Sequence, residues 1–413
     1  MIYISLLLYL IWLTFYYDIL GRTKKKEFSY WLVLLLLVLM SGLRYRVGAD
    51  SLNYLNSFYY NTPTLHNLTL EEVFNSQTTR YEPFFYLLNI LVKSLGLKFY
   101  FFQLVHAFLV NTLIFVYIRK HCDYVFSCVL FYFFWIFSTY NFEELRASLG
   151  LVFCLYANDF FIKRKWIKGI CFCLMGCMFH FSVAVFLLTP FFLFLKTGRK
   201  GYLFLIASYF VAYIVQNKLG DFLFIMNSSL TDDFSGKMSD YVENDVLFSQ
   251  WVSLKGIALR RMPCIVFSLW SMGFIKSIGL YKTERIKSLE PIMMLGLAFM
   301  IFSIPIAGCY RFVNLYTLYY IIPISQFFVL LIRNNLSMGT LAYIRALFLI
   351  SPLLLMVFKN YYFCQMDVSG SQKMYHFHKM YPYSSVIEKS IDPDREKFFR
   401  NWDIGNNVPL SKY

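Results

Sequence analysis

The sequence predicts an all-α polytopic membrane protein, and two observations carry this prediction. Of the 413 residues, 58% are hydrophobic and only 15% are charged, whereas soluble proteins carry about 25% charged residues. Apolar runs of about 14 to 22 residues also recur along the whole chain, as expected of helices that span a bilayer. A string of soluble domains is therefore excluded. In a membrane protein the net charge of +15 reflects basic loops that orient the spans, so we expect no nucleic-acid partner.

The apolar runs predict about 12 transmembrane helices. Three of them, at 28–43, 167–180 and 182–195, are short for a bilayer roughly 30 Å thick. The first run lacks a basic leader and a small-residue cleavage site, so we expect a span there rather than a cleavable signal peptide. The predicted spans are residues 2–20, 28–43, 99–118, 123–140, 146–162, 167–180, 182–195, 201–217, 257–275, 290–308, 313–332 and 341–358.

The segment 84–97 is also apolar, but it is short and contains Asn89 and Lys93. We interpret it as an interfacial or re-entrant helix. Counting it as a full span would place Arg119 and Lys120 outside and would invert every later turn, against the positive-inside rule. With both termini outside, the inward turns carry the basic clusters at 22–26, 119–120, 163–168, 196–200, 276–287 and Arg333.

This topology gives one membrane domain, residues 1–358, followed by an extracytoplasmic tail, residues 359–413. The membrane domain has long outer loops at 44–98 and 218–256. The second loop is rich in Asp and Glu, and it is equally consistent with a lid over a site and with a solvated linker. Because the outer loops are long and the inner turns are short, we expect the protein to act at the outer face of the membrane.

Arginine, carboxylate and histidine side chains gather in the segments that this topology places at the outer surface. Guanidinium groups bind anions through planar, paired donors. Several arginines on one face would repel one another unless carboxylates or an anion lay between them, which favours a phosphate-bearing ligand. Each residue alone is also consistent with snorkelling or, for His180, with packing. The residues are Arg44, Arg46, Asp50, Arg80, Glu82, Glu143, Glu144, Arg146, His180 and Arg311.

Sequence motifs for nucleotide or metal chemistry are missing from the chain. There is no P-loop, no dinucleotide-binding fingerprint and no His-Glu-x-x-His motif. His376 and His378 would project to one side of an extended segment, but a metal site needs more than two ligands. We therefore expect neither a cofactor nor a metal, which argues against nucleotide hydrolysis and zinc proteolysis.

The segment after the second predicted span resembles the opening motif of a known family, the EpsG-type branch of the Wzy-like polysaccharide polymerases. In that family a Gly-Thr-Asp sequence follows an arginine, with a tyrosine four residues later. Arg44, Gly48, Asp50 and Tyr54 match this pattern. Ala49 replaces the threonine, so a hydroxyl contact from that position is lost.

Further motifs follow in the family's order along nearly the whole chain. Each is weak alone, and the resemblance rests on their order and on their shared predicted face. Val183 stands where the family usually has a small residue. The motifs are Glu82-Pro83, Arg146 before the small residues Ala147, Ser148 and Gly150, His180-Phe181-Ser182, Arg311 before a tyrosine-rich span, and Tyr381-Pro382-Tyr383.

The resemblance implies a membrane glycosyltransferase of the C-type architecture. Such enzymes join oligosaccharide repeat units carried on undecaprenyl diphosphate at the outer face of the bacterial inner membrane, for exopolysaccharide, capsule or O-antigen. The partners implied are this lipid-linked oligosaccharide, the bilayer and a regulator of chain length.

The predicted site needs cations for a leaving diphosphate and a base for the acceptor hydroxyl. Guanidinium groups stabilise developing charge in a water-poor site, which makes a metal ion unnecessary. The base is one of Asp50, Glu82 and His180. The residues expected to bind the diphosphate or sugars are Arg44, Arg46, Tyr54, Arg80, Arg146 and Arg311.

Two other functions stay open. A non-enzymatic exporter or flippase of the same lipid-linked glycan would also need basic residues. It should show internal repeats and a charged path through the midplane, and the sequence shows neither. A membrane acyltransferase that modifies polysaccharide would need a histidine near a carboxylate on the inner face, and His121 alone is weak support.

Overall fold

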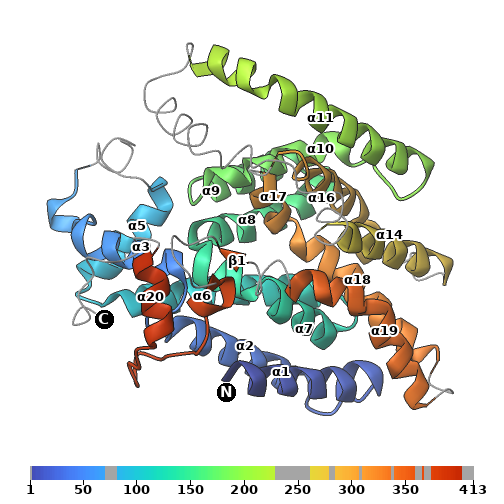
Figure 1. Cartoon of the computed structure of the whole chain (residues 1–413), viewed down its shortest axis with the longest axis horizontal. Helices are drawn as coiled ribbons and strands as arrows, with labels where there is room; N and C mark the ends of the chain where they lie inside the picture. The colour runs from blue at the N-terminus through green and yellow to red at the C-terminus, as the bar shows by residue number, and fades with distance from the viewer. Residues whose placement is uncertain are drawn as a thin grey trace.

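The chain folds as a bundle of helices, which confirms the all-α prediction. The computed structural model describes residues 2–69, 81–227, 261–278, 284–306, 309–335, 339–358, 365–366 and 374–401. Figure 1 shows many of the long helices lying along the long axis of the molecule, with α11 (Arg199–Asn227) at its edge. Within the described residues, the strands are β1 (Gln365–Met366) and β2 (Met374–Tyr375), which form a two-stranded antiparallel pair.

The helices of the first half of the chain carry most of the predicted site. A π-helix, η1, continues the first helix, and a second π-helix, η3, precedes α8. In order, the elements are α1 (Ile2–Leu13), η1 (Thr14–Ile19), α2 (Lys26–Gly42), α3 (Ala49–Tyr60), η2 (Leu65–Asn67), α5 (Pro83–Ser94), α6 (Phe99–His121), α7 (Val125–Trp135), η3 (Thr139–Glu143), α8 (Leu145–Ile162), α9 (Trp166–Cys177), η4 (Phe181–Leu188) and α10 (Thr189–Phe192).

The helices of the second half complete the bundle and lead to a short helix near the C-terminus. After α11 they are α14 (Met262–Ser277), α15 (Glu284–Lys287), α16 (Glu290–Phe302), α17 (Tyr310–Leu315), α18 (Thr317–Arg333), α19 (Thr340–Val357), the 3-10 helix η9 (His376–Lys379) and α20 (Pro393–Asn401). His376 and His378 therefore lie in a 3-10 helix, and the prediction of an extended segment there is wrong.

Several helix boundaries differ from those predicted: α7 ends at Trp135, the span predicted at 182–195 is η4 followed by the short α10, and α16 ends at Phe302. Helix α11 continues to Asn227, because apolar residues resume after Asp221. The rest of the acidic loop, from residue 228 onward, lies outside the described residues. The predicted span 313–332 is divided into α17 and α18, which meet at Tyr316, where the backbone has φ −92° and ψ 0°.

Three helices of the described chain are long and apolar enough to cross a membrane: Ile2–Ile19, Phe99–His121 and Leu145–Ile162. Several other apolar helices are shorter. The chain is therefore a helical membrane protein, and the count of 12 spans and the interfacial placement of α5 stay predictions.

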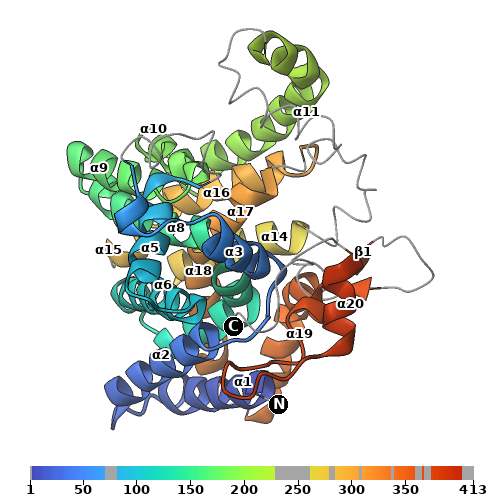
Figure 2. The ribbon, with the colours of Figure 1, turned by 90° about the vertical axis from the view of Figure 1, so that its left-hand side faces the viewer.

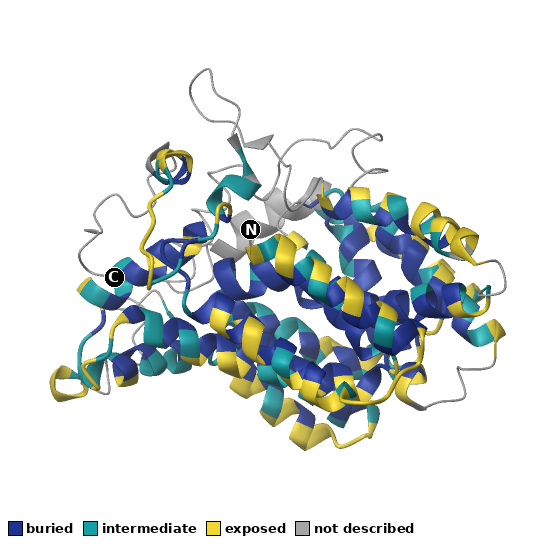
Figure 3. Ribbon diagram, turned by 90° about the horizontal axis from the view of Figure 1, so that it is seen from below, coloured by how far each residue is buried: buried dark blue, intermediate teal, exposed yellow. Residues whose placement is uncertain are grey.

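The helices pack closely where glycine permits it. A Cβ atom on Gly150 of α8 would lie 2.8 Å from the carbonyl oxygen of Gly176 in α9, so these backbones can touch only without side chains. In the same way, a Cβ atom on Gly42 of α2 would lie 2.6 Å from Cδ1 of Leu104 in α6. Figure 3 shows buried residues on the inner faces of the helices and exposed residues on the outer faces.

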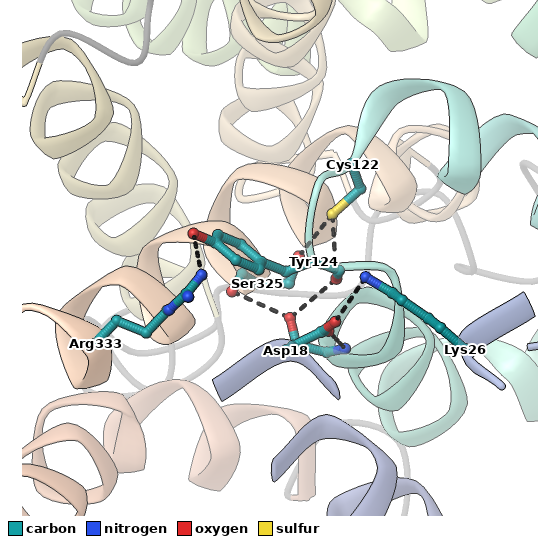
Figure 4. A network of polar contacts seen from close by, with 7 residues as sticks. Asp18, Lys26, Cys122, Tyr124, Ser325 and Arg333 are labelled. Carbon is teal, nitrogen blue, oxygen red and sulfur yellow. Dashed lines mark hydrogen bonds and ion pairs between the residues drawn. The ribbon is translucent and has the colours of Figure 1, made fainter. Parts of the chain in front are cut away.

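One end of the bundle collects the basic turns, and we call it the basic end. Asp18 accepts a hydrogen bond from the N–H of Ser127 at 2.7 Å and lies 3.8 Å from Lys26 (Figure 4). In the same network Arg333 donates to the hydroxyl of Tyr124 at 3.4 Å. These contacts join η1, α2, α7 and α18 at their ends.

The described part of the predicted tail packs against the turn that follows α2. The N–H of Tyr45 donates to the carbonyl of Ser384 at 2.8 Å, and the N–H of Val386 donates to the carbonyl of Leu43 at 2.9 Å. Tyr3 near the N-terminus also donates to the carbonyl of Met380 at 3.0 Å. We call residues 374–401 the C-terminal segment, and Figure 2 shows it (red) passing the N-terminus.

Candidate functional site

Arg44 lies in the turn after α2, and its side chain is fully buried. Its Nε donates to the carbonyl of Val47 at 3.3 Å and its Nη2 donates to the hydroxyl of Ser51 at 3.1 Å. Its Nη1 donates to the carbonyl of Ser41. The guanidinium carbon also lies 5.3 Å from the centre of the Phe142 ring. These contacts fix the shape of the turn and keep Arg44 away from the surface.

Arg46 is also buried, and it binds the C-terminal segment. Its Nε and Nη2 donate to the two carboxylate oxygens of Glu396 in α20, each at 2.8 Å. This paired geometry is the strongest that an arginine and a carboxylate can form. The ion pair therefore anchors α20 to the turn.

Gly48 begins the helix that carries Asp50. Its φ is +89°, and a Cβ there would lie 2.5 Å from the carbonyl oxygen of Phe142, so only glycine fits. Glu143, at the end of η3, accepts a hydrogen bond from the N–H of Ala49 at 2.9 Å. A carboxylate is favoured at this helix N-terminus by the helix dipole. Asp50 follows in the first turn of α3, close enough for the charge of Glu143 to act on it.

Glu82 connects two other predicted site residues. It precedes α5, whose first residue, Pro83, suits the first turn of a helix. Oε2 of Glu82 accepts from Nη1 of Arg146 at 3.0 Å, and Oε1 accepts from Nδ1 of His180 at 2.8 Å. Burial alone would raise the pKa of Glu82, but the hydrogen bond from His180 and the charge of Arg146 lower it to about 2. Glu82 therefore stays ionised and orients both partners.

Aromatic rings surround the guanidinium group of Arg146. Its Nε donates to the hydroxyl of Tyr54 at 3.4 Å. Its guanidinium carbon lies 5.1 Å from the ring centre of Tyr81 and 5.9 Å from that of Tyr54. The two tyrosine rings also pack against Phe85. Arg146, at the start of α8, is thus held by contacts from α3 and from the start of α5.

Asp50 is exposed, yet it lies among four other charged groups. Desolvation by the surrounding protein raises the pKa of Asp50, and the charge of Glu143 raises it further. The charges of Lys379, Arg146 and Arg311 act in the opposite direction, and the resulting pKa is about 6. Asp50 can therefore exchange a proton near neutral pH. We call this end of the bundle the Asp50 end.

Glu144 is a third carboxylate at the Asp50 end. Burial raises its pKa to about 7, against the hydrogen bond that the side-chain amide of Asn314 donates at 2.7 Å and against the charge of Arg311. The charges of Asp50 and Glu143 contribute to the same rise. Asp50, Glu143 and Glu144 thus form a group of carboxyls whose mutual repulsion favours protonation and is opposed by nearby cations.

The structure brings most of the predicted site residues together. Arg146 contacts Glu82 and Tyr54, Glu82 contacts His180, and the charges of Arg146 and Arg311 act on Asp50. Arg44 and Arg46 lie nearby but are buried in contacts with the protein itself. Arg80 lies outside the described residues. The roles of all these residues stay predictions.

Two residues at this end were not predicted from the sequence. Lys379 lies 3.1 Å from Glu143, and no local pattern in the polar C-terminal segment singles it out. Asn314 gives a weak signal, because it is a polar residue within an apolar run. Within the described residues, no group of three His, Cys, Asp or Glu side chains is arranged to hold a metal ion.

Comparisons with known proteins give one finding. No curated protein and no solved structure matches the chain. The EpsG family matches residues 27–385, from the first turn of α2 into the C-terminal segment. This range includes Arg44, Asp50, Glu82 and Arg146, which confirms the resemblance that the motifs indicated. The chain belongs to the EpsG family, a family of Wzy-like polysaccharide polymerases.

Proposed function

We propose that the protein is a glycosyltransferase that joins oligosaccharide repeat units carried on undecaprenyl diphosphate. The single observation that best supports a reaction centre is the position of Arg146. Its side chain contacts Glu82 and Tyr54, and its charge acts on Asp50. Residues of two other predicted motifs, Tyr54 of α3 and Glu82 before α5, therefore contact one guanidinium group, and His180 after α9 is joined to it through Glu82.

The reaction asks for stabilisation of a leaving diphosphate. The acceptor hydroxyl oxygen attacks the anomeric carbon of the donor saccharide, and the bond from that carbon to the phosphate oxygen breaks. The electron pair leaves with the lipid diphosphate. In this proposal Arg146 and Arg311 bind that diphosphate, because preorganised guanidinium groups stabilise charge as it develops. Glu82 holds Arg146 in place, so the cation need not reorganise during the reaction.

The acceptor hydroxyl must lose a proton, and Asp50 is the base in this proposal. Its pKa of about 6 suits a base that works near neutral pH. Glu82, with a pKa of about 2, is too weak a base for this step. Its ionised carboxylate instead orients His180 and Arg146. Of the two carboxylates, Asp50 is therefore favoured over Glu82 as the base.

Arg44 and Arg46 take a different role in this proposal from the one predicted. Their guanidinium groups are buried, where Arg44 binds the turn itself and Arg46 binds Glu396. A diphosphate has no access to a fully buried group such as Arg44. We therefore assign both arginines to positioning: Arg44 shapes the turn before Asp50, and Arg46 anchors the C-terminal segment.

The remaining features of the proposal concern the membrane. The helix ends at the basic end carry the predicted inward turns, which supports a cytoplasmic position for this end and an outward position for the Asp50 end. About 12 spans, an interfacial α5 and a C-type architecture belong to the same proposal. The protein would then act in the bacterial inner membrane, with a regulator of chain length as its expected protein partner.

One observation bears on the acyltransferase alternative. His121 Nε2 lies 3.0 Å from Asp159 Oδ1 at the basic end, as that alternative requires. However, only 5% and 8% of these side chains are exposed, and Lys120 also pairs with Asp159. Because the pair is buried and Asp159 is already shared with Lys120, we interpret this arrangement as a structural contact between α6 and α8. An acyl-transfer assay with purified protein and an activated acyl donor should give no modified glycan.

In vitro polymerisation tests the proposed function. Purified protein is incubated with its lipid-diphosphate repeat unit, without nucleotide and with a chelator, and the glycan is resolved by gel electrophoresis. We expect a ladder of elongated chains. The matched variant Arg146→Lys keeps the charge but loses the forked donors, and it should form the ladder much more slowly. Unchanged glycan that merely crosses vesicles would support an exporter and overturn the proposal.

A further inference from the structure

The C-terminal segment is built into the Asp50 end. Its backbone pairs with the turn after α2 through an isolated antiparallel bridge between Arg44 and Ser385. The carbonyl of Lys379 accepts a hydrogen bond from the N–H of Gly48 at 2.9 Å, and Glu396 holds Arg46. The segment is thus fixed at both of its ends to the turn that begins α3.

This attachment places Lys379 beside the carboxylates. Its Nζ lies 3.1 Å from Glu143 Oε2, while the other oxygen of Glu143 accepts from the N–H of Ala49. Only 13% of the Lys379 side chain and 11% of the Glu143 side chain are exposed. The charge of Lys379 also acts on Asp50, together with those of Arg146 and Arg311. Three cations from distant parts of the chain therefore surround one carboxylate.

We propose that Lys379 is a third cationic ligand of the lipid diphosphate, delivered by the C-terminal segment and held in reserve by Glu143 until the diphosphate arrives. This inference rests on the proposed function and adds a binding residue to it. The lipid diphosphate gains a further negative charge when the bond to the anomeric carbon breaks, so that its charge exceeds that of two arginines, and lysine is a flexible point donor that suits phosphate oxygens. On binding, Lys379 exchanges one anionic partner for another.

The proposal makes opposite predictions for the two members of one ion pair. Lys379→Met should weaken the binding of undecaprenyl diphosphate in mixed micelles by about ten-fold to a hundred-fold, as expected for the loss of a hydrogen bond between charged groups. Glu143→Gln should tighten binding by about three-fold to ten-fold, because it removes the competing charge. Gln keeps an oxygen for the N–H of Ala49. A salt bridge with a purely structural role would give the same sign for both variants.

A double variant excludes a general electrostatic effect of Glu143. If Glu143→Gln acts by releasing Lys379, its gain in affinity should largely disappear when Lys379→Met is also present, because the two residues are then coupled. Lys389→Met is the matched control, since it makes the same change at an exposed position of the same segment. It should leave the affinity unchanged.

Each outcome decides the proposal. Unchanged affinity in Lys379→Met, or an undiminished gain from Glu143→Gln in the double variant, would overturn the role of Lys379 while leaving the proposed function standing. If Lys379→Met fails to fold, Lys379→Gln replaces it in the single and double variants, and weaker binding in Glu143→Gln would overturn the role. Wild-type protein that does not bind undecaprenyl diphosphate at all would overturn the proposed function, and the role of Lys379 with it.

Discussion

The two ends of the bundle treat carboxylates in opposite ways. At the basic end, carboxylates are separated and paired. Asp159 lies between Lys120 and His121, and Glu290, whose side chain is fully buried, pairs with Lys276. Each buried charge there has its own cation, as burial requires. These pairs join helices and need no ligand to be stable.

At the Asp50 end, three carboxylates act on one another. The charge of Glu143 raises the pKa of both Asp50 and Glu144, and the balancing cations come from α8, α17 and the C-terminal segment. Carboxylates that repel one another destabilise the folded state, and such groups are found most often at functional sites. On the proposed function, the contrast separates charges that hold the bundle together from charges that take part in the reaction.

Matched substitutions at the two ends give the largest expected contrast. Asp50→Asn removes the proposed base, so the rate of chain elongation should fall by about a hundred-fold to ten-thousand-fold. Asp159→Asn makes the same change at the basic end, where it should lower thermal stability and leave the rate per folded molecule unchanged. Elongation rates and unfolding temperatures in detergent measure both. Full activity in Asp50→Asn would contradict the assignment of the base.

The arginines offer the next largest contrast. Arg146→Lys should reduce elongation by about a hundred-fold to a thousand-fold, because a preorganised donor to the developing charge is lost. Arg285→Lys is the matched control, since Arg285 lies in an exposed pair with Asp123, 3.4 Å away, at the basic end. It should elongate chains at the wild-type rate. Equal losses in the two variants would remove the distinction between the ends.

The sequence predicted the two ends unequally well. Helix positions and basic turns follow from local composition, so the helices and the convergence of Glu82, Arg146 and His180 could be foreseen. The burial of Arg44 and Arg46 could not be predicted, because burial depends on which distant segment of the chain covers a residue. Arg46 and Glu396 are separated by 350 positions in the sequence. Lys379 was missed for the same reason, since its neighbours at the Asp50 end are known only from the fold.

The pH dependence of the rate sharpens the comparison through the titration of Asp50. A base works only when deprotonated, so kcat/KM should rise about ten-fold per pH unit below pH 6 and level off above it. The groups that set this pKa are Glu143, Lys379, Arg146 and Arg311.

The group responsible for the rise in kcat/KM below pH 6, the acid limb of the profile, can be identified with variants. Glu82, with a pKa of about 2, stays ionised over this whole range and adds no limb. The residual activity of Asp50→Asn should lack the acid limb. An unchanged limb in that variant would assign the titration to another group, with Glu144 and its pKa of about 7 as the first to examine.

The smallest effect is expected at Asp18, which tests whether the basic end is purely structural. Asp18→Asn keeps an oxygen for the N–H of Ser127 but loses the charge that favours the start of α7 and the ion pair with Lys26. Loss of a carboxylate at a helix N-terminus costs about 0.3–1 kcal/mol, so the unfolding temperature should fall slightly. Elongation should be unaffected, because Asp18 binds Ser127 and Lys26 at the basic end. A fall in rate without a fall in unfolding temperature would mean that the basic end also takes part in the reaction.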